Sequence, residues 1–117
     1  MQQRNRLFAF AIAATLAAGS AIAADNSVYL SMRNKIGLLA WCQGKGHIGA
    51  GEAAAAAAKV KKAVDYIGGD AKNGKEAGDA AETAGKAGQY GSMKTPVEKF
   101  ATMMDSTPLA QCKEWAQ

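Results

Sequence analysis

The sequence has few of the residues that build catalytic and metal sites. It contains one histidine, His47, and two cysteines, Cys42 and Cys112. The cysteines lack the close C-x-x-C spacing of a redox pair, and His47 alone leaves a metal site short of ligands. The serines after residue 24 lack the flanking glycines of a nucleophile elbow. We therefore predict that the protein is not an enzyme and has no catalytic residue, cofactor or metal.

Long apolar runs, blocks of like charge and strand-like alternation are also missing after residue 24. No stretch there reaches the roughly 20 apolar residues of a membrane-spanning helix. Basic and acidic residues are interspersed, whereas a nucleic-acid-binding protein typically carries a basic face. In no segment do apolar and polar residues alternate with period two over the length of a strand. These absences predict a soluble all-α domain without a nucleic acid partner.

The first 23 residues have the pattern of a secretory signal peptide. Arg4 and Arg6 precede an apolar run over residues 7–18, and the small residues Ala21 and Ala23 follow. The run is too short to span a membrane, and no cysteine lies where a lipoprotein would need one for acylation. We expect cleavage after Ala23, a periplasmic or secreted location, and a single helical domain over residues 24–117.

Cys42 and Cys112 are predicted to form a disulfide. An even number of cysteines in a small exported domain is typical of an oxidising compartment. In the chain-entropy model, closing a loop of about 70 residues stabilises the folded state by roughly 4 kcal/mol. A redox pair and a pair of metal ligands are the alternatives, and both lack neighbouring partners in the sequence.

Two helices are predicted in the first half of the domain. Apolar residues recur at helical spacing over residues 27–43, and Arg33 and Asn34 are expected to lie off this stripe. The stripe comprises Val28, Met32, Ile36, Leu39 and Cys42. Residues 51–67 are rich in alanine, the strongest helix former, and two glycines follow them.

A third helix is predicted over residues 75–86, where alanine, glycine and charged residues dominate. It has little to bury, and Gly78 and Gly85 each cost about 1 kcal/mol relative to alanine, so we expect a marginal, mobile helix. The carboxylates of this segment recur at helical spacing. They are interpreted as surface residues paired with lysines rather than as a cation site. The carboxylates are Glu76, Asp79 and Glu82, and the lysines are Lys75 and Lys86.

Two helix starts are predicted near the C-terminus. Thr95 and Glu98 flank Pro96 in the pattern of a capping box, which predicts a helix from Pro96. Thr107 followed by proline repeats the device and begins a final helix that carries Cys112. The predicted fold is therefore a small all-α bundle of four to five short helices, with one disulfide joining the first and last.

Four residues form a possible interaction surface. Trp41 and Trp115 each adjoin a cysteine and are expected to pack around the disulfide, and either ring becomes a partner surface if it is exposed. Lys59 and Lys62 lie on the face of the alanine-rich helix that is predicted to be exposed to solvent. His47, in a glycine-rich loop, is expected to be exposed.

Three parts of the chain resemble a family of short exported proteobacterial proteins. They are RNKIGLLAWC over residues 33–42, AGDAAE over residues 77–82, and a C-terminal helix with one cysteine. The family is described as pore-forming proteins of the early secreted antigenic target family. The resemblance implies a membrane-active role, for which the alanine-rich helix over residues 52–67 is the candidate element.

The function predicted from these features is that of a small exported helical protein without catalytic activity. Its expected partner is another protein or a membrane surface. An acid-stress chaperone of the periplasm or an envelope-interaction protein is the alternative.

Overall fold

The computed structural model describes residues 26–117 as six helices and one pair of short strands. The helices are α2 (Ser27–Gly44), α3 (Ala50–Tyr66), α4 (Gly69–Asn73), α5 (Lys75–Lys86), α6 (Val97–Met103) and α7 (Pro108–Trp115), and the strands are β1 (Gln89–Tyr90) and β2 (Thr95–Pro96). The predicted signal segment, residues 1–23, lies outside the described residues. The predicted helical fold is confirmed. The structure has one helix more than the four to five predicted. This additional helix is α4, a short helix between α3 and α5. None of these helices is long and apolar enough to cross a membrane.

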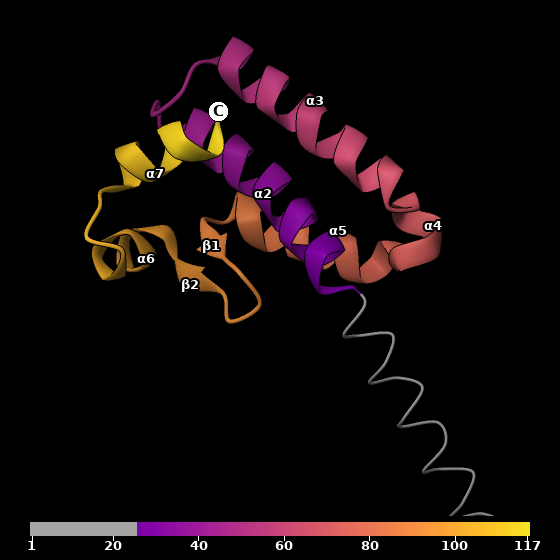
Figure 1. Cartoon of the computed structure of the whole chain (residues 1–117). Helices are drawn as coiled ribbons and strands as arrows, with labels where there is room; N and C mark the ends of the chain where they lie inside the picture. Colours follow the sequence, from indigo (N-terminus) through magenta and orange to yellow (C-terminus); the bar gives the residue numbers. More distant parts are fainter. Residues whose placement is uncertain (1–25) are drawn as a thin grey trace, which may run out of the picture.

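Helix α2 lies at the centre of the domain, between α3 and α5 (Figure 1). Helix α3 runs antiparallel to α2, because Cys42 clusters with Ala53 and Tyr29 clusters with Val64. Helix α5 runs parallel to α2, because Tyr29 contacts Gly78 and Leu38 contacts Gly85. A helix covered on two sides buries residues around much of its circumference. Arg33 and Asn34, which lie off the predicted apolar stripe, are therefore buried as well. They are only 7% and 4% exposed.

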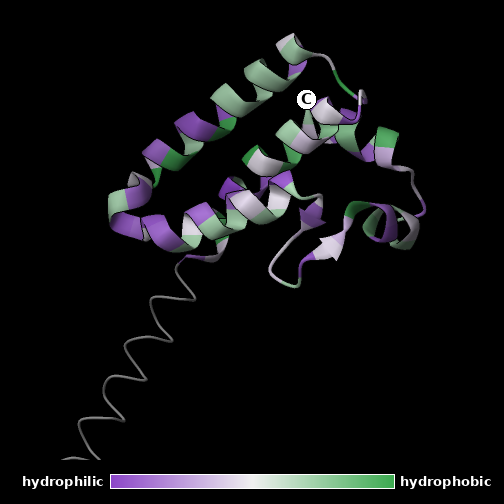
Figure 2. Ribbon diagram, turned by 180° about the vertical axis from the view of Figure 1, so that it is seen from behind, coloured by the Kyte–Doolittle hydropathy of each residue, from purple (hydrophilic) through white to green (hydrophobic). Residues whose placement is uncertain are grey.

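Two apolar clusters hold α3 against α2. The cluster around the disulfide has as its buried members Leu39, Cys42, Ile48, Ala53, Ala56 and Cys112. The second cluster joins Tyr29 to Val60 and Val64. Val28, predicted for the buried stripe, is 56% exposed, because Tyr29 takes the inward position in the first turn of α2. Figure 2 shows that hydrophobic residues predominate along the first half of α3, whereas hydrophilic residues are more frequent toward α4.

Glycines set the distance between α2 and α5. A Cβ atom on Gly37 would overlap the carbonyl oxygen of Glu82, and one on Gly85 would overlap the carbonyl oxygen of Asn34. The two backbones therefore touch with no side chain between them, and close packing of small groups replaces bulk. This helix has few large groups to bury, as expected, yet it packs closely through its small residues. Its buried residues are Gly78, Ala84 and Gly85.

The predicted disulfide is confirmed. The sulfur atoms of Cys42 and Cys112 are 2.05 Å apart, and their Cα atoms are 5.7 Å apart. The bond joins α2 to α7, the first and last helices of the described residues. Structural disulfides are typical of oxidising compartments outside the cytoplasm.

Tertiary contacts decide one of the two predicted helix starts. Thr95 pairs with Tyr90 in the two-stranded ladder, and the amide of Val97 donates to the carbonyl of Gly88 at 2.9 Å. The predicted capping box at Thr95 is therefore wrong, and α6 begins at Val97 with no side-chain cap. The second start is confirmed, because the Thr107 hydroxyl accepts a hydrogen bond from the Ala110 amide at 3.1 Å.

Candidate functional site

A groove of about 500 Å³ lies between α2, α5 and the turn that joins β1 to β2. Each helix contributes four residues spaced i, i+3, i+4 and i+7, which places them on one face over about 10 Å of helix. The lining residues are Ser27, Leu30, Ser31 and Asn34 from α2, Ala77, Ala80, Ala81 and Ala84 from α5, and Tyr90, Gly91, Ser92 and Lys94 from β1 and the turn. The volume falls within the range of about 300–1,000 Å³ that is typical of small-molecule sites.

The alanines of α5 keep the groove open. Contacts at Gly37 and Gly85 bring the backbone of α5 against α2 on one face of the helix pair. On the adjacent face, α5 presents only methyl groups to the groove, so no large side chain fills it. Ala80 is exposed and Ala81 is half-buried. The result is an apolar floor that remains accessible from solvent.

Asn34 connects the three walls of the groove. Its amide nitrogen donates to the carbonyl oxygens of Ala81 at 3.1 Å and of Gln89 at 3.0 Å. Its amide oxygen accepts from the backbone N–H of Gly91 at 3.0 Å. One buried side chain of α2 thus fixes both α5 and the turn, and its own polar groups are already satisfied.

A stack of aromatic rings supports the wall formed by Tyr90. The ring centroids of Tyr90 and Phe100 are 3.9 Å apart, and the Tyr90 and Trp115 rings are 5.8 Å apart and nearly parallel. Trp115 also packs against the cluster around the disulfide. Offset stacking of this kind adds to the stabilisation from burial. The groove wall is therefore connected to the disulfide through aromatic contacts.

The groove carries one charged side chain, that of Lys94. A tight turn places this residue at the rim, with its amide donating to the carbonyl of Gly91 at 3.1 Å and its φ in the left-handed region at 54°. Among residues 26–117, no carboxylate forms an ion pair with Lys94. Hydroxyl groups, including that of Ser31, complete the polar rim.

His47 lies far from Ser31 in the groove. Gly44 lies thirteen positions after Ser31, which corresponds to about 20 Å along α2, and His47 follows that end of the helix. The His47 ring is half-buried rather than exposed as expected, and it lies 5.9 Å from the Trp41 ring. Ser31 and His47 therefore do not form a serine–histidine pair for nucleophilic catalysis.

Beside the groove, Arg33 joins α2 to α4 and α5. Its guanidinium forms ion pairs with Asp70 at 2.8 Å, with Glu82 at 3.2 Å, and with Asp79. The Tyr29 hydroxyl accepts from Arg33 at 2.9 Å and donates to Asp70 at 2.7 Å. The Arg33 side chain is 9% exposed. This Arg33 cluster therefore places a cation inside the fold with three acidic partners.

The pKa shifts in the Arg33 cluster favour the ionised forms of Arg33 and Asp79. Hydrogen bonds from Lys75, and then from Arg33, hold the pKa of Asp79 below its usual value. Burial alone would lower the pKa of Arg33, but its hydrogen bonds, first among them those to Asp79 and Tyr29, outweigh burial and raise it. Burial is the largest cause that raises the pKa of Tyr29. Arg33 and Asp79 are therefore both ionised at neutral pH.

The predicted lysine pairs of α5 are present, but they share their carboxylates with Arg33. Lys75 lies 2.7 Å from Asp79, and Lys86 lies 3.5 Å from Glu82. The sequence indicated only these local partners. Among residues 26–117, no three or more His, Cys, Asp or Glu side chains are grouped so that they could hold a metal ion.

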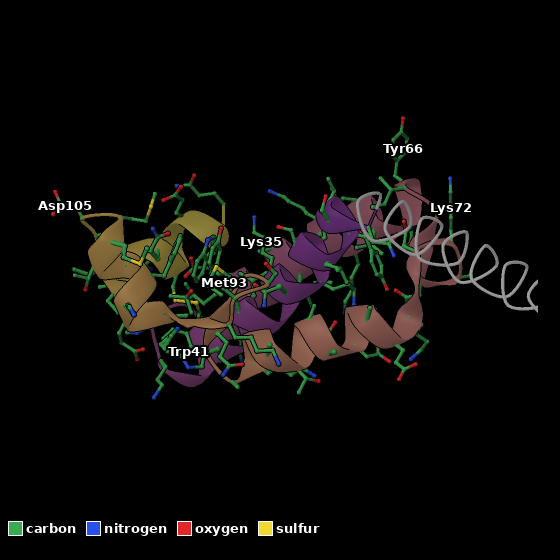
Figure 3. All side chains as sticks on the ribbon, turned by 90° about the horizontal axis from the view of Figure 1, so that it is seen from below. Lys35, Trp41, Tyr66, Lys72, Met93 and Asp105 are labelled. Carbon is green, nitrogen blue, oxygen red and sulfur yellow. A yellow bond between two sulfur atoms is a disulfide. The ribbon has the colours of Figure 1, made fainter. Side chains whose placement is uncertain are left out.

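The four residues of the predicted interaction surface lie outside the groove lining. Trp41 and Trp115 are half-buried and pack against the cluster around the disulfide. Lys59 and Lys62 are exposed on α3. Figure 3 shows Trp41 among the packed side chains, whereas Tyr66 at the end of α3 points into solvent. Their role in partner binding stays a prediction.

The sequence analysis did not identify the groove residues as a site. The available signal was the equal i, i+3, i+4, i+7 spacing in residues 27–34 and 77–84. That spacing predicts a face on each helix, but it does not indicate that the two faces meet. The contribution of Lys94 depends on a turn whose strands are only two residues long.

The chain matches no protein-family model, no curated protein and no solved structure. The pore-forming role implied by its resemblance to the exported family therefore stays a prediction. What the protein does is inferred from its own groove and ion pairs.

Proposed function

We propose that this chain is an exported protein that acts by binding rather than by catalysis, and that the groove between α2 and α5 is its binding site. The lining of the groove carries this proposal, because it combines an apolar floor with hydroxyl groups and one lysine at the rim. Small-molecule sites typically combine these features. General acid–base catalysis needs a titratable group within about 3 Å of the proton that moves. The described lining holds no histidine or carboxylate.

The signal pattern and the disulfide support export to the periplasm or to the outside of the cell. The apolar run near the N-terminus has the length of a signal segment. The Cys42–Cys112 bond is stable where thiols are oxidised. Export would place the groove in contact with envelope components.

Native mass spectrometry of the protein purified from its producing cells tests this proposal. We expect a stoichiometric non-covalent adduct on the wild type that is missing from Ala80→Trp, because the indole would fill the exposed floor of the groove. Ala54→Trp, at an exposed position of α3, is the matched control and should retain the adduct. Failure to find an adduct on the wild type would count against the proposal. Turnover of ester, amide or glycoside substrates by the purified protein would overturn it.

The Arg33 cluster favours a second candidate, an acid-stress chaperone. Protonation of the acidic partners would leave a buried guanidinium without counter-charges, which is strongly unfavourable. Helix α5 would then loosen from α2 and expose apolar surface to unfolded clients. An aggregation assay with a client protein at about pH 2 tests this candidate, because the pKa of Asp79 is lowered and its protonation needs a pH well below the usual carboxyl pKa. Unchanged client aggregation would reject it.

A further inference from the structure

The floor of the groove suits a narrow aliphatic chain. The α5 side contributes only methyl groups, from Ala77, Ala80, Ala81 and Ala84, and the α2 side contributes Leu30. Because α2 and α5 run in the same direction, the two faces stay in register over about 10 Å. A straight apolar segment can therefore contact both helices along their shared length.

The same floor disfavours a polypeptide. Backbone N–H and C=O groups placed against it would need hydrogen-bond partners. The amide groups of Asn34, a buried polar residue of the lining, already bond to Ala81, Gln89 and Gly91. An aliphatic chain has no such groups to satisfy, so it can occupy the floor without that cost.

The rim indicates the charge of the ligand. Lys94 is the one charged residue of the lining, and no carboxylate lines the groove to repel an anion. The turn that holds Lys94 is fixed to the Asn34 end of the groove through the bond from Gly91. Hydroxyl groups of Ser31 and Ser92 are placed in the same lining as further donors. A single ammonium group with hydroxyl neighbours complements one carboxylate.

From these features we infer that the groove binds a single-chain amphiphile with one carboxylate head group, such as a free medium-chain fatty acid. The carboxylate pairs with Lys94, and the tail lies between Leu30 and the alanines of α5 toward the start of α2. This inference rests on the proposed binding function and names its ligand class.

Two probes with the same tail and opposite head charge test the ligand class. Dodecanoate and dodecyltrimethylammonium are titrated below micelle formation into the exported, disulfide-bonded protein. Calorimetry and amide NMR shifts follow the binding. We expect saturable one-to-one binding of dodecanoate, with shifts centred on Ala80, Ala81 and Gly91. The ammonium probe should bind at least about tenfold more weakly, the effect of one lost charge-assisted hydrogen bond.

Variants at the rim and the floor separate the two parts of the site. Lys94→Glu should reverse the preference between the probes, and Lys94→Asn, which tolerates positive φ, should remove it. Lys99→Glu makes the same charge change on exposed α6 and should leave binding unchanged. Ala80→Trp should abolish binding of both probes. Circular dichroism confirms that each variant is folded.

The outcomes distinguish the ligand class from the binding function. Equal affinity for both probes in the groove would overturn the carboxylate inference and leave the proposed binding function standing. Amide shifts centred elsewhere would overturn the site. Binding to anionic vesicles, or dye leakage from them, without binding of free dodecanoate would overturn the inference in favour of a membrane surface. Hydrolysis of a dodecanoate ester would overturn the proposed function itself.

Discussion

The backbone of Gly37 in α2 lies directly against the carbonyl oxygen of Glu82 in α5, so that only a hydrogen atom fits at the glycine Cα. Gly85 makes the reciprocal contact with the carbonyl oxygen of Asn34. These two contacts set how closely the helices approach. They also set the width of the groove, because its two helical walls belong to the same pair.

Alanine at either glycine should destabilise the fold. In Gly37→Ala and Gly85→Ala the added methyl group would overlap backbone atoms of the partner helix, which cannot move aside as a side chain can. We expect a loss of about 1–3 kcal/mol in the free energy of unfolding, measured in urea. Gly51→Ala is the control, because nothing lies within 4 Å of its added Cβ, and it should be neutral or slightly stabilising. A Gly37→Ala protein as stable as this control would contradict the packing described.

An aspartate at position 34 should destabilise the protein in a pH-dependent manner. The Asn34 amide nitrogen donates to two carbonyl oxygens, and Asn34→Asp would replace this donor with an ionised acceptor in a buried position. Each unsatisfied buried group costs about 1–3 kcal/mol. Burial should raise the pKa of the new carboxyl group, so the loss should be larger at neutral pH than in acid. Urea unfolding at both pH values measures it. An equal loss at both would contradict this role of Asn34.

The free energy of unfolding should decrease at acidic pH, because protonation of Asp79 weakens the Arg33 cluster. The pKa of Asp79 is lowered in the folded state by Lys75 and Arg33, from an ordinary value of 3.8. Its ionised form therefore stabilises the fold above that value, and this contribution is lost as the pH falls through the lower, folded-state pKa. We expect the free energy of unfolding to decline between about pH 5 and about pH 2.

Arg33→Met should weaken this decline and lower stability at neutral pH by about 1–3 kcal/mol, since it removes several charged hydrogen bonds. Lys59→Met removes the same charge from an exposed site of α3 and should change neither quantity appreciably. Parallel pH profiles for the wild type and Arg33→Met would show that the cluster does not control acid stability.

Removing the disulfide should cost about 4 kcal/mol, because the bond closes a loop over a separation of 70 residues. The double variant Cys42→Ala, Cys112→Ala tests this by urea unfolding. The wild type under reducing conditions provides an independent comparison. A loss below about 1 kcal/mol in both would indicate that apolar packing alone holds α7 on α2.

Local signals in the sequence were sufficient for most helix positions. Residues 75–86 were predicted as a helix with the bounds that α5 has. Helix α2 differs from its predicted bounds by one residue at its C-terminal end, and α3 differs by one residue at each end. The Thr107 cap and the disulfide were also predicted correctly. These features depend on helix propensity, capping groups a few positions apart, and a single possible pairing of two cysteines.

Contacts between distant segments decided the rest. Arg33 binds carboxylates 37, 46 and 49 positions away, so it lies inside although its local pattern placed it off the buried face. Thr95 pairs with Tyr90 instead of capping α6. The glycines expected to weaken α5 are the residues that bring it against α2. Propensity acts within a few residues of the chain, and it determined where the helices are. Which faces meet depends on the packing of whole helices, and only that packing decided where the buried ion pairs and the groove lie.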